Sequence, residues 1–205
     1  MIKIIDCGSQ LTQNIARRVR ELGVFTEIVP YKSSCDITKK DLEGIIISGG
    51  QFSVYDDNAP TYAKDVLNFG VPVLGICYGQ QSIAHILGGK VKSTENREYG
   101  GTNVTITKES PLFKGINEKE FHVWMSHGDI VEEVPPGFEV TAKSQNNHIA
   151  SMQKENIYAV QFHPEVDQTK YGRKILENFV EICNAERNWD PEKDYDRLVA
   201  DIKER

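Results

Sequence analysis

The sequence has few cysteines, four in 205 residues, and no two of them form a C-x-x-C pair. So small a number excludes a disulfide-stapled fold, and the wide spacing argues against a zinc ribbon or a redox dithiol. We therefore expect reduced thiols, most of them buried, in a cytoplasmic protein, and we expect no metal site. The four are Cys7, Cys35, Cys77 and Cys183.

Long apolar runs and an excess of basic residues are also lacking. No run approaches the ~20 residues that a membrane-spanning helix needs. The first residues are typical of a strand rather than of the apolar segment of a signal peptide. Lys and Arg number 24 against 30 Asp and Glu, a net charge of −6, whereas a nucleic-acid binder is typically basic. We expect no membrane partner and no nucleic-acid partner.

What the sequence does contain is the composition of a globular domain. Hydrophobic residues make up 39% of the chain and charged residues 26%, which argues against a disordered protein. A chain of this length can bury about 70% of its unfolded surface, so it needs no disulfide or metal to fold. One large domain is therefore the expected organisation.

Up to about residue 90, strand-like and helix-like segments alternate. Short apolar runs are typical of buried strands, and the stretches between them carry apolar residues at helical spacing. The alternation predicts an α/β fold, in which a mostly parallel central sheet is flanked by helices on both faces. The expected strands are 2–7, 25–29, 44–48 and 71–76, and the expected helices are 11–22, 63–69 and 80–87.

After residue 100 the pattern changes to short strands separated by turn signals such as Pro-Pro-Gly at 135–137. Short connections favour antiparallel pairing, so we expect these strands to be appended to the parallel sheet. A helix is expected after them, at 172–187. The expected strands are 103–107, 121–125, 138–142, 149–152 and 157–162.

The last residues form a separate segment. After the break at Trp189-Asp190-Pro191, apolar residues recur at i, i+3, i+4 and i+7 among charges. This spacing predicts a short amphipathic helix. The helix could fold back onto its own core or dock on another domain or subunit, and both alternatives stay open.

The strongest local motif is Gly-Ile-Cys-Tyr-Gly at 75–79, between an expected strand and an expected helix. G-x-C-x-G at such a junction is the cysteine form of the nucleophile elbow, a sharp turn that lifts the side chain out of the sheet. The N-terminus of the following helix favours the thiolate form of the sulfur. We predict that Cys77 is a nucleophile; the alternative is a buried cysteine in a glycine turn.

A cysteine nucleophile needs a base, and the base needs a group that orients it. His163-Pro164-Glu165 can supply both. Pro164 favours an extended backbone at the preceding residue, and residues two apart in an extended chain project to the same side. Glu165 could therefore hold one ring nitrogen of His163 while the other faces Cys77. Taken alone, H-P-E would be a surface turn. We expect His85, His122 and His148 to be structural, because no such partner is near them in the sequence.

Attack on a carbonyl creates an oxyanion, which main-chain N–H groups stabilise. In a nucleophile elbow one donor is the residue after the nucleophile, here Tyr78. The second donor must come from another strand end. Ser-Gly-Gly at 48–50 follows an expected strand and could turn an amide inward; the alternative is a plain strand-exit turn.

These motifs, in this order, resemble the class I (triad-type) glutamine amidotransferases. The matching segments are S-G-G at 48–50, G-I-C-Y-G-Q-Q at 75–81 and Q-F-H-P-E-V at 161–166. The resemblance implies a flavodoxin-like α/β sheet with appended antiparallel strands. Three further segments resemble the branch of the family that serves GMP synthesis: 5–24, N-R-E-Y-G at 96–100 and V-W-M-S-H-G-D at 123–129.

The resemblance implies that glutamine is hydrolysed to glutamate and ammonia through a γ-glutamyl thioester on Cys77. His163 would act as base and acid, oriented by Glu165, and the amides of Gly50 and Tyr78 would form the oxyanion hole. The family's proline after S-G-G is replaced here by Gln51, which we expect to loosen that loop. The positions implied for substrate binding are Gln81, Tyr99, Gly100, Gly101, Ser126 and His127.

The resemblance also implies a partner. Residues 1–187 would be the glutaminase domain, and residues 188–205 a connector to a synthetase that aminates XMP to GMP. The pyrophosphate-binding S-G-G-V-D-S segment of such synthetases is absent from this sequence. We therefore expect ATP and Mg²⁺ on the synthetase and no cofactor for the glutaminase reaction. Two alternatives remain: a glutaminase for anthranilate or aminodeoxychorismate synthesis, and a catalytically silent regulatory subunit.

Overall fold

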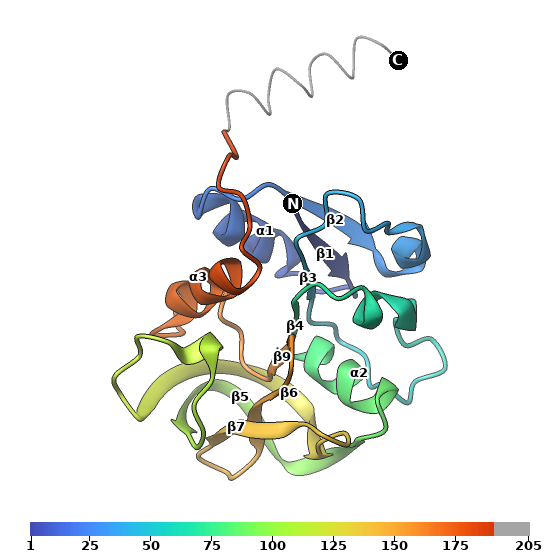
Figure 1. The fold of residues 1–205 in the computed structure, drawn as a ribbon. Helices are drawn as coiled ribbons and strands as arrows, with labels where there is room; N and C mark the ends of the chain where they lie inside the picture. Colours follow the sequence, from blue (N-terminus) through green and yellow to red (C-terminus); the bar gives the residue numbers. More distant parts are fainter. Residues whose placement is uncertain (191–205) are drawn as a thin grey trace.

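The computed structural model describes residues 1–190, which form one mixed sheet with helices on both faces (Figure 1). The amphipathic helix expected after Pro191 lies outside the described residues. The sheet has nine strands in the order β2-β1-β3-β4-β9-β8-β7-β5-β6. Its first five strands are parallel, and the remaining pairings are antiparallel.

The parallel half consists of short strands, which are largely buried except for the edge strand β2. They are β1 (Ile2–Asp6), β2 (Thr26–Pro30), β3 (Gly44–Ile47), β4 (Val73–Ile76) and β9 (Ile157–Val160). Such strands are covered by helices on both faces, which explains their continuous apolar sequences. The strands expected in the first half of the chain are all confirmed, with ends shifted by one or two residues.

Two apolar clusters fill the space between sheet and helices. On one face, α1 (Thr12–Glu21) and α3 (Gly172–Ile182) pack on the sheet through residues such as Ile15 and Phe179. On the other face, α2 (Tyr78–Ile86) and the 3₁₀ helix η2 (Lys64–Asn68) pack through residues such as Ile83 and Val66. Two further 3₁₀ helices are η1 (Tyr31–Asp36) and η3 (Pro111–Phe113).

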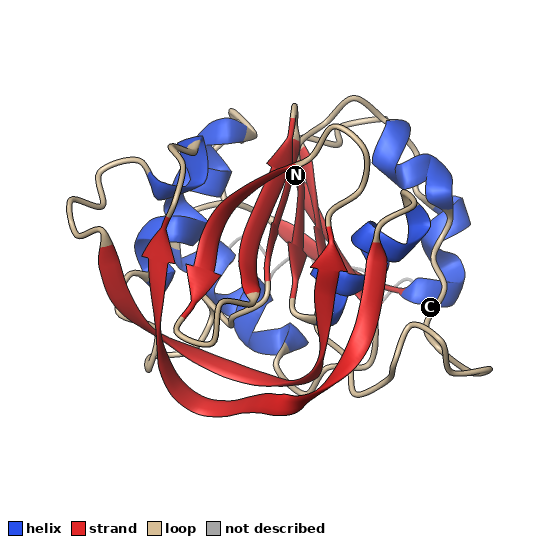
Figure 2. Cartoon of the chain, turned by 90° about the horizontal axis from the view of Figure 1, so that it is seen from below, coloured by secondary structure: helices blue, strands red, loops and turns tan. Residues whose placement is uncertain are grey.

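The antiparallel half differs from the sequence prediction in strand length. The short strands expected at 103–107 and 121–125 are parts of two long strands, β5 (Lys90–Ile106) and β6 (Glu120–Glu133). They run as a curved ribbon beneath the parallel strands (Figure 2). Only three of the 17 residues of β5 are buried, so the strand carries no apolar run. β7 (Glu139–Ser144) and β8 (Ile149–Lys154) complete the antiparallel half.

Three more predictions need correction. The sequence pattern places 157–162 among the appended antiparallel strands, but β9 pairs parallel with β4 on one side and antiparallel with β8 on the other. The helix expected at 63–69 is a 3₁₀ helix. The helix expected at 172–187 ends at Ile182, because Asn184 has a positive φ of 47°. None of the described helices has the length and apolar character needed to cross a membrane.

Candidate active site

Cys77 lies at a sharp turn between β4 and α2. β4 ends at Ile76 and α2 begins at Tyr78, so Cys77 alone makes the connection, with φ 55° and ψ −108°. Its main-chain N–H donates to the carbonyl of Val160 at 2.8 Å, which ties the turn to β9. A positive φ is uncommon for a non-glycine residue and marks local strain. The expected elbow geometry is therefore present.

The two glycines of the elbow are required because the turn is tightly packed. A Cβ at Gly75 would lie 2.6 Å from the Ile83 side chain, and a Cβ at Gly79 would lie 2.3 Å from the carbonyl oxygen of Ile47. Both distances are too short for any side chain. The G-x-C-x-G pattern thus reflects close contact between β3, β4 and α2.

His163 and Glu165 follow β9, the strand that neighbours β4. His163 Nδ1 lies 2.8 Å from Glu165 Oε1, and both side chains are buried. The main chain of His163 is held from both sides: its N–H donates to the Trp124 carbonyl at 3.0 Å, and its carbonyl accepts from the Thr169 hydroxyl at 2.6 Å. Because the Glu165 oxygen accepts, the proton of the imidazole lies on Nδ1 and Nε2 is left for another partner.

That other partner is Cys77. The two side chains approach each other at Gly49, whose Cβ position would lie 3.4 Å from His163 Cε1 and 3.6 Å from Cys77 Cβ. Burial alone would lower the pKa of His163. The charge of Cys77, its hydrogen bond and the hydrogen bond of Glu165 outweigh burial and raise the pKa of His163 well above its usual value of 6.5. The arrangement therefore favours the protonated form of His163.

A cleft of about 490 Å³ opens over Cys77 and His163. Its walls come from the β1–α1 loop, the loop after β3, and β5 and β6. Of the residues expected at the site, seven line it: Gly50, Cys77, Gln81, Tyr99, Ser126, His127 and His163. Glu165 is buried behind His163.

The two expected oxyanion donors lie side by side. A Cβ at Gly50 would be 3.4 Å from the ring of Tyr78 and 2.7 Å from the carbonyl oxygen of Cys7, so only glycine fits there. Tyr78 is the first residue of α2, and its N–H has no acceptor within the helix. Gly50 therefore packs against Tyr78, the residue that follows the nucleophile, and it lines the same cleft as Cys77.

Gly100 and Gly101 lie away from the cleft. Both are part of β5, where Gly100 pairs with Met125 and Gly101 with Trp124. The Cβ position of Gly101 is covered by the ring of His122 at 2.4 Å. Tyr99 itself is 66% exposed and lies at the edge of the cleft.

Several cleft residues were not singled out from the sequence. Arg97 and Asp129 line the cleft, as do Ser9 and Gln10 of the β1–α1 loop. Their side chains are brought together by folding, and only the N-R-E-Y-G and S-H-G-D segments of the resemblance pointed to that region. Three of the four cysteines are buried, as expected for most of the thiols, and Cys35 is exposed.

A model of the class-I glutamine amidotransferases matches residues 3–183. The chain belongs to this family. The amidotransferase resemblance and its α/β fold are therefore confirmed. Among solved structures, a Thermoplasma acidophilum protein described as one of the subunits of GMP synthase is similar, with a TM-score of 0.77 and 35% identity over 89% of this chain and 93% of that chain.

Curated members of the family are similar over the whole sequence. A protein of Clostridium kluyveri named GMP synthase [glutamine-hydrolyzing] is 48% identical over 208 residues, which cover 100% of this chain and 41% of the relative. One of Brachyspira hyodysenteriae with the same name is 48% identical over 92% of this chain and 37% of the relative. This amidotransferase chain thus spans about two fifths of the length of these relatives.

Proposed function

We propose that this amidotransferase hydrolyses L-glutamine to glutamate and ammonia, and that the ammonia serves the amination of XMP to GMP by a synthetase. One observation carries the proposal: the Cys77 elbow faces a buried His163–Glu165 pair at the base of an open cleft. A cysteine, a histidine and an orienting carboxylate in this arrangement are suited to acyl transfer.

In this proposal Cys77 Sγ attacks the side-chain carbonyl carbon of glutamine. The C–N bond breaks, the nitrogen takes a proton from His163 and leaves as ammonia, and a γ-glutamyl thioester remains. His163 then removes a proton from water, the resulting hydroxide attacks the thioester, and glutamate leaves as the Cys77 thiolate is restored. Glu165 keeps Nδ1 protonated throughout and stabilises the imidazolium.

The tetrahedral intermediates carry a negative oxygen, and we assign its donors to the amides of Gly50 and Tyr78. Gly50 lines the cleft with Cys77 and packs against Tyr78, which directly follows Cys77, and these positions support the role. The other end of glutamine is a zwitterion. The cleft wall offers a cation, Arg97, and an anion, Asp129, which match an α-carboxylate and an α-ammonium group. Gln81, Tyr99, Ser126 and His127 complete the proposed substrate site.

The partner is inferred from the relatives. Those named GMP synthase are more than twice as long as this chain, which supports a synthetase acting with this domain. We propose that residues 1–187 are the glutaminase domain, that residues 188–205 connect to the synthetase, and that ATP and Mg²⁺ belong to the synthetase.

The names of the relatives favour GMP synthesis over the anthranilate and aminodeoxychorismate pathways. Four free cysteines support a reducing, cytoplasmic location.

Ammonia release from glutamine tests this function. The purified chain is assayed alone and with an XMP-amidating synthetase supplied with ATP, Mg²⁺ and XMP. We expect ammonia release, and we expect glutamine to support GMP formation only when both proteins are present. No release under either condition would favour the silent regulatory subunit. Release without any transfer to XMP would leave the glutaminase intact and refute the proposed partner.

A further inference from the structure

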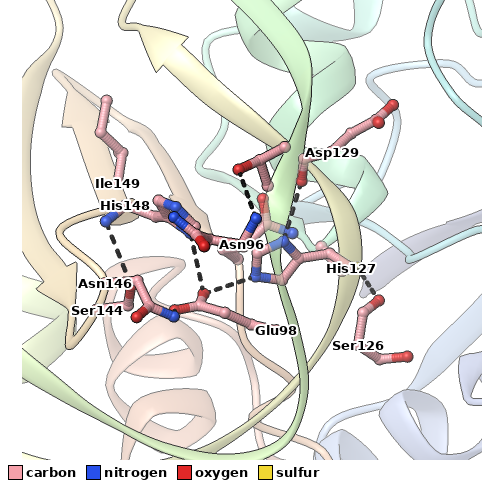
Figure 3. A network of polar contacts seen from close by, with 12 residues as sticks. Asn96, Glu98, Ser126, His127, Asp129, Ser144, Asn146, His148 and Ile149 are labelled. Carbon is pink, nitrogen blue, oxygen red and sulfur yellow. Dashed lines mark hydrogen bonds and ion pairs between the residues drawn. The ribbon is translucent and has the colours of Figure 1, made fainter.

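A second buried carboxylate–histidine pair lies beside the cleft, apart from Cys77, His163 and Glu165. Glu98 of β5 is 5% exposed, and its Oε2 lies 2.9 Å from Nε2 of His127 on β6 (Figure 3). Oε2 also lies 3.5 Å from Nδ1 of His148, and Oε1 accepts from Asn146 Nδ2 at 3.0 Å. His148 therefore has a carboxylate partner, contrary to the sequence-based expectation.

His127 is bonded at both ring nitrogens to oxygens that can only accept. Nδ1 lies 3.0 Å from the carbonyl oxygen of Asp129, and Nε2 faces the Glu98 carboxylate. Burial alone would raise the pKa of Glu98. Hydrogen bonds from His127 and Ser144, with the charges of His127 and His148, lower that pKa to about 2. The pair is thus a buried contact between the His127 ring and the Glu98 carboxylate.

This pair lies at a break in the β5–β6 ladder. Ser93 pairs with Asp129 and Glu98 with His127, so residues 94–97 of β5 bulge out opposite Gly128. Strand register beyond a bulge must be fixed by specific cross-strand contacts. Glu98 and His127 are the first directly opposed pair beyond the bulge, and they fix the register there.

The segment that this pair holds is a wall of the cleft. Ser126, on one side of His127, has its carbonyl oxygen 3.7 Å from Cys77 Sγ. Asp129, on the other side, has a carbonyl oxygen that accepts from Gln81 Nε2 at 2.8 Å. A shift of His127 would therefore displace main-chain groups next to the nucleophile and next to the helix that follows it.

We propose that Glu98 is a positioning residue: through His127 it holds the main chain of residues 126–129 in the place where that segment orients glutamine against Cys77. The inference rests on the proposed glutaminase function and deepens it. A buried ion pair contributes little net stability compared with apolar packing, and its best-attested role is to select one register. Glu98 and His127 fit that role, because they join two strands at a bulge beside the reacting atoms.

Glu98→Gln tests the inference, because the amide keeps the size of the side chain and removes its charge. We expect the KM for glutamine to rise about tenfold, since small displacements at a site cost this much or more. Labelling of Cys77 by an electrophilic glutamine analogue should slow by a similar factor. Iodoacetamide, a small electrophile that needs no orientation, should label Cys77 within about twofold of the wild-type rate. Glu95→Gln, an exposed residue of the same strand, is the matched control.

Two results would overturn the inference. The first is an unchanged rate of Cys77 labelling by the glutamine analogue in Glu98→Gln. The second is an equal fall in the labelling rates of the analogue and of iodoacetamide. If Glu98→Gln does not fold, Asn146→Ala removes only the contact to Oε1, and it should raise the KM in the same direction. Amide hydrogen exchange separates this inference from the proposed function. Even if wild-type protein is not labelled and the glutaminase proposal fails, residues 126–129 should exchange faster in Glu98→Gln than in Glu95→Gln. Equal exchange would refute the positioning role.

Discussion

Cys77→Ala should lower glutamine hydrolysis by about 10⁴-fold or more, because loss of the nucleophile in a triad leaves only binding and oxyanion stabilisation. The substitution removes the sulfur that lies beside His163 at the base of the cleft. Amination of XMP supplied with free ammonia should continue at the wild-type rate, since that reaction takes place on the synthetase. Ammonia release and GMP formation are measured with the same preparations.

The matched control is Cys35→Ala, which removes an exposed thiol far along the chain from the elbow. It should hydrolyse glutamine at the wild-type rate. Substantial glutaminase activity in Cys77→Ala would mean that another group forms the covalent bond or that none is formed. Loss of ammonia-dependent synthesis in the same variant would instead indicate that the substitution disturbs the partner.

Gly79→Ala should be strongly destabilising, by about 2–4 kcal/mol of unfolding free energy, because overpacking against a rigid backbone cannot be relieved. The added Cβ would lie 2.3 Å from the carbonyl oxygen and 3.0 Å from the carbonyl carbon of Ile47. Those atoms belong to the buried strand β3. Urea denaturation of the variant and of the wild-type protein measures the difference in unfolding free energy.

Gly70→Ala separates this clash from the ordinary strain of a positive φ. Gly70 has a φ of 81° and no atom within 4 Å of its Cβ position. Its substitution should cost about 1 kcal/mol, the usual penalty for a side chain in the left-handed region. If Gly79→Ala were as mild as Gly70→Ala, the close approach of α2 to β3 would be wrong.

The parallel half of the fold could be predicted because its strands are buried on both faces and appear as continuous apolar runs, as at Ile45 to Ile47. The long ribbon formed by β5 and β6 could not be predicted in this way. β5 has one largely exposed face, rich in Lys, Glu and Asn, so its first half resembles a loop in sequence. The sequence pattern groups β9 with the antiparallel part because its neighbour in sequence, β8, is antiparallel, whereas its parallel partner β4 is some 80 residues earlier.

The candidate site also contains residues that could be predicted from the sequence and residues that could not. Cys77, His163 and Glu165 could be proposed because each stands in a short motif whose local geometry follows from glycine, proline and extended backbone. Glu98 lies in the N-R-E-Y-G segment at 96–100, whose resemblance implied no local geometry for it. Its partners His127 and His148 come from other parts of the chain, and the contacts depend on a bulge that no local pattern indicates. Arg97 reaches the cleft through the same bulge.

We propose that Cys77 is the residue that bonds covalently to glutamine. Its most direct test is reaction with an electrophilic glutamine analogue, followed by peptide mapping of all four cysteines by mass spectrometry. We expect one label per chain, on Cys77, and protection of that label by excess glutamine. A label on Cys7, Cys35 or Cys183 in place of Cys77 would contradict it.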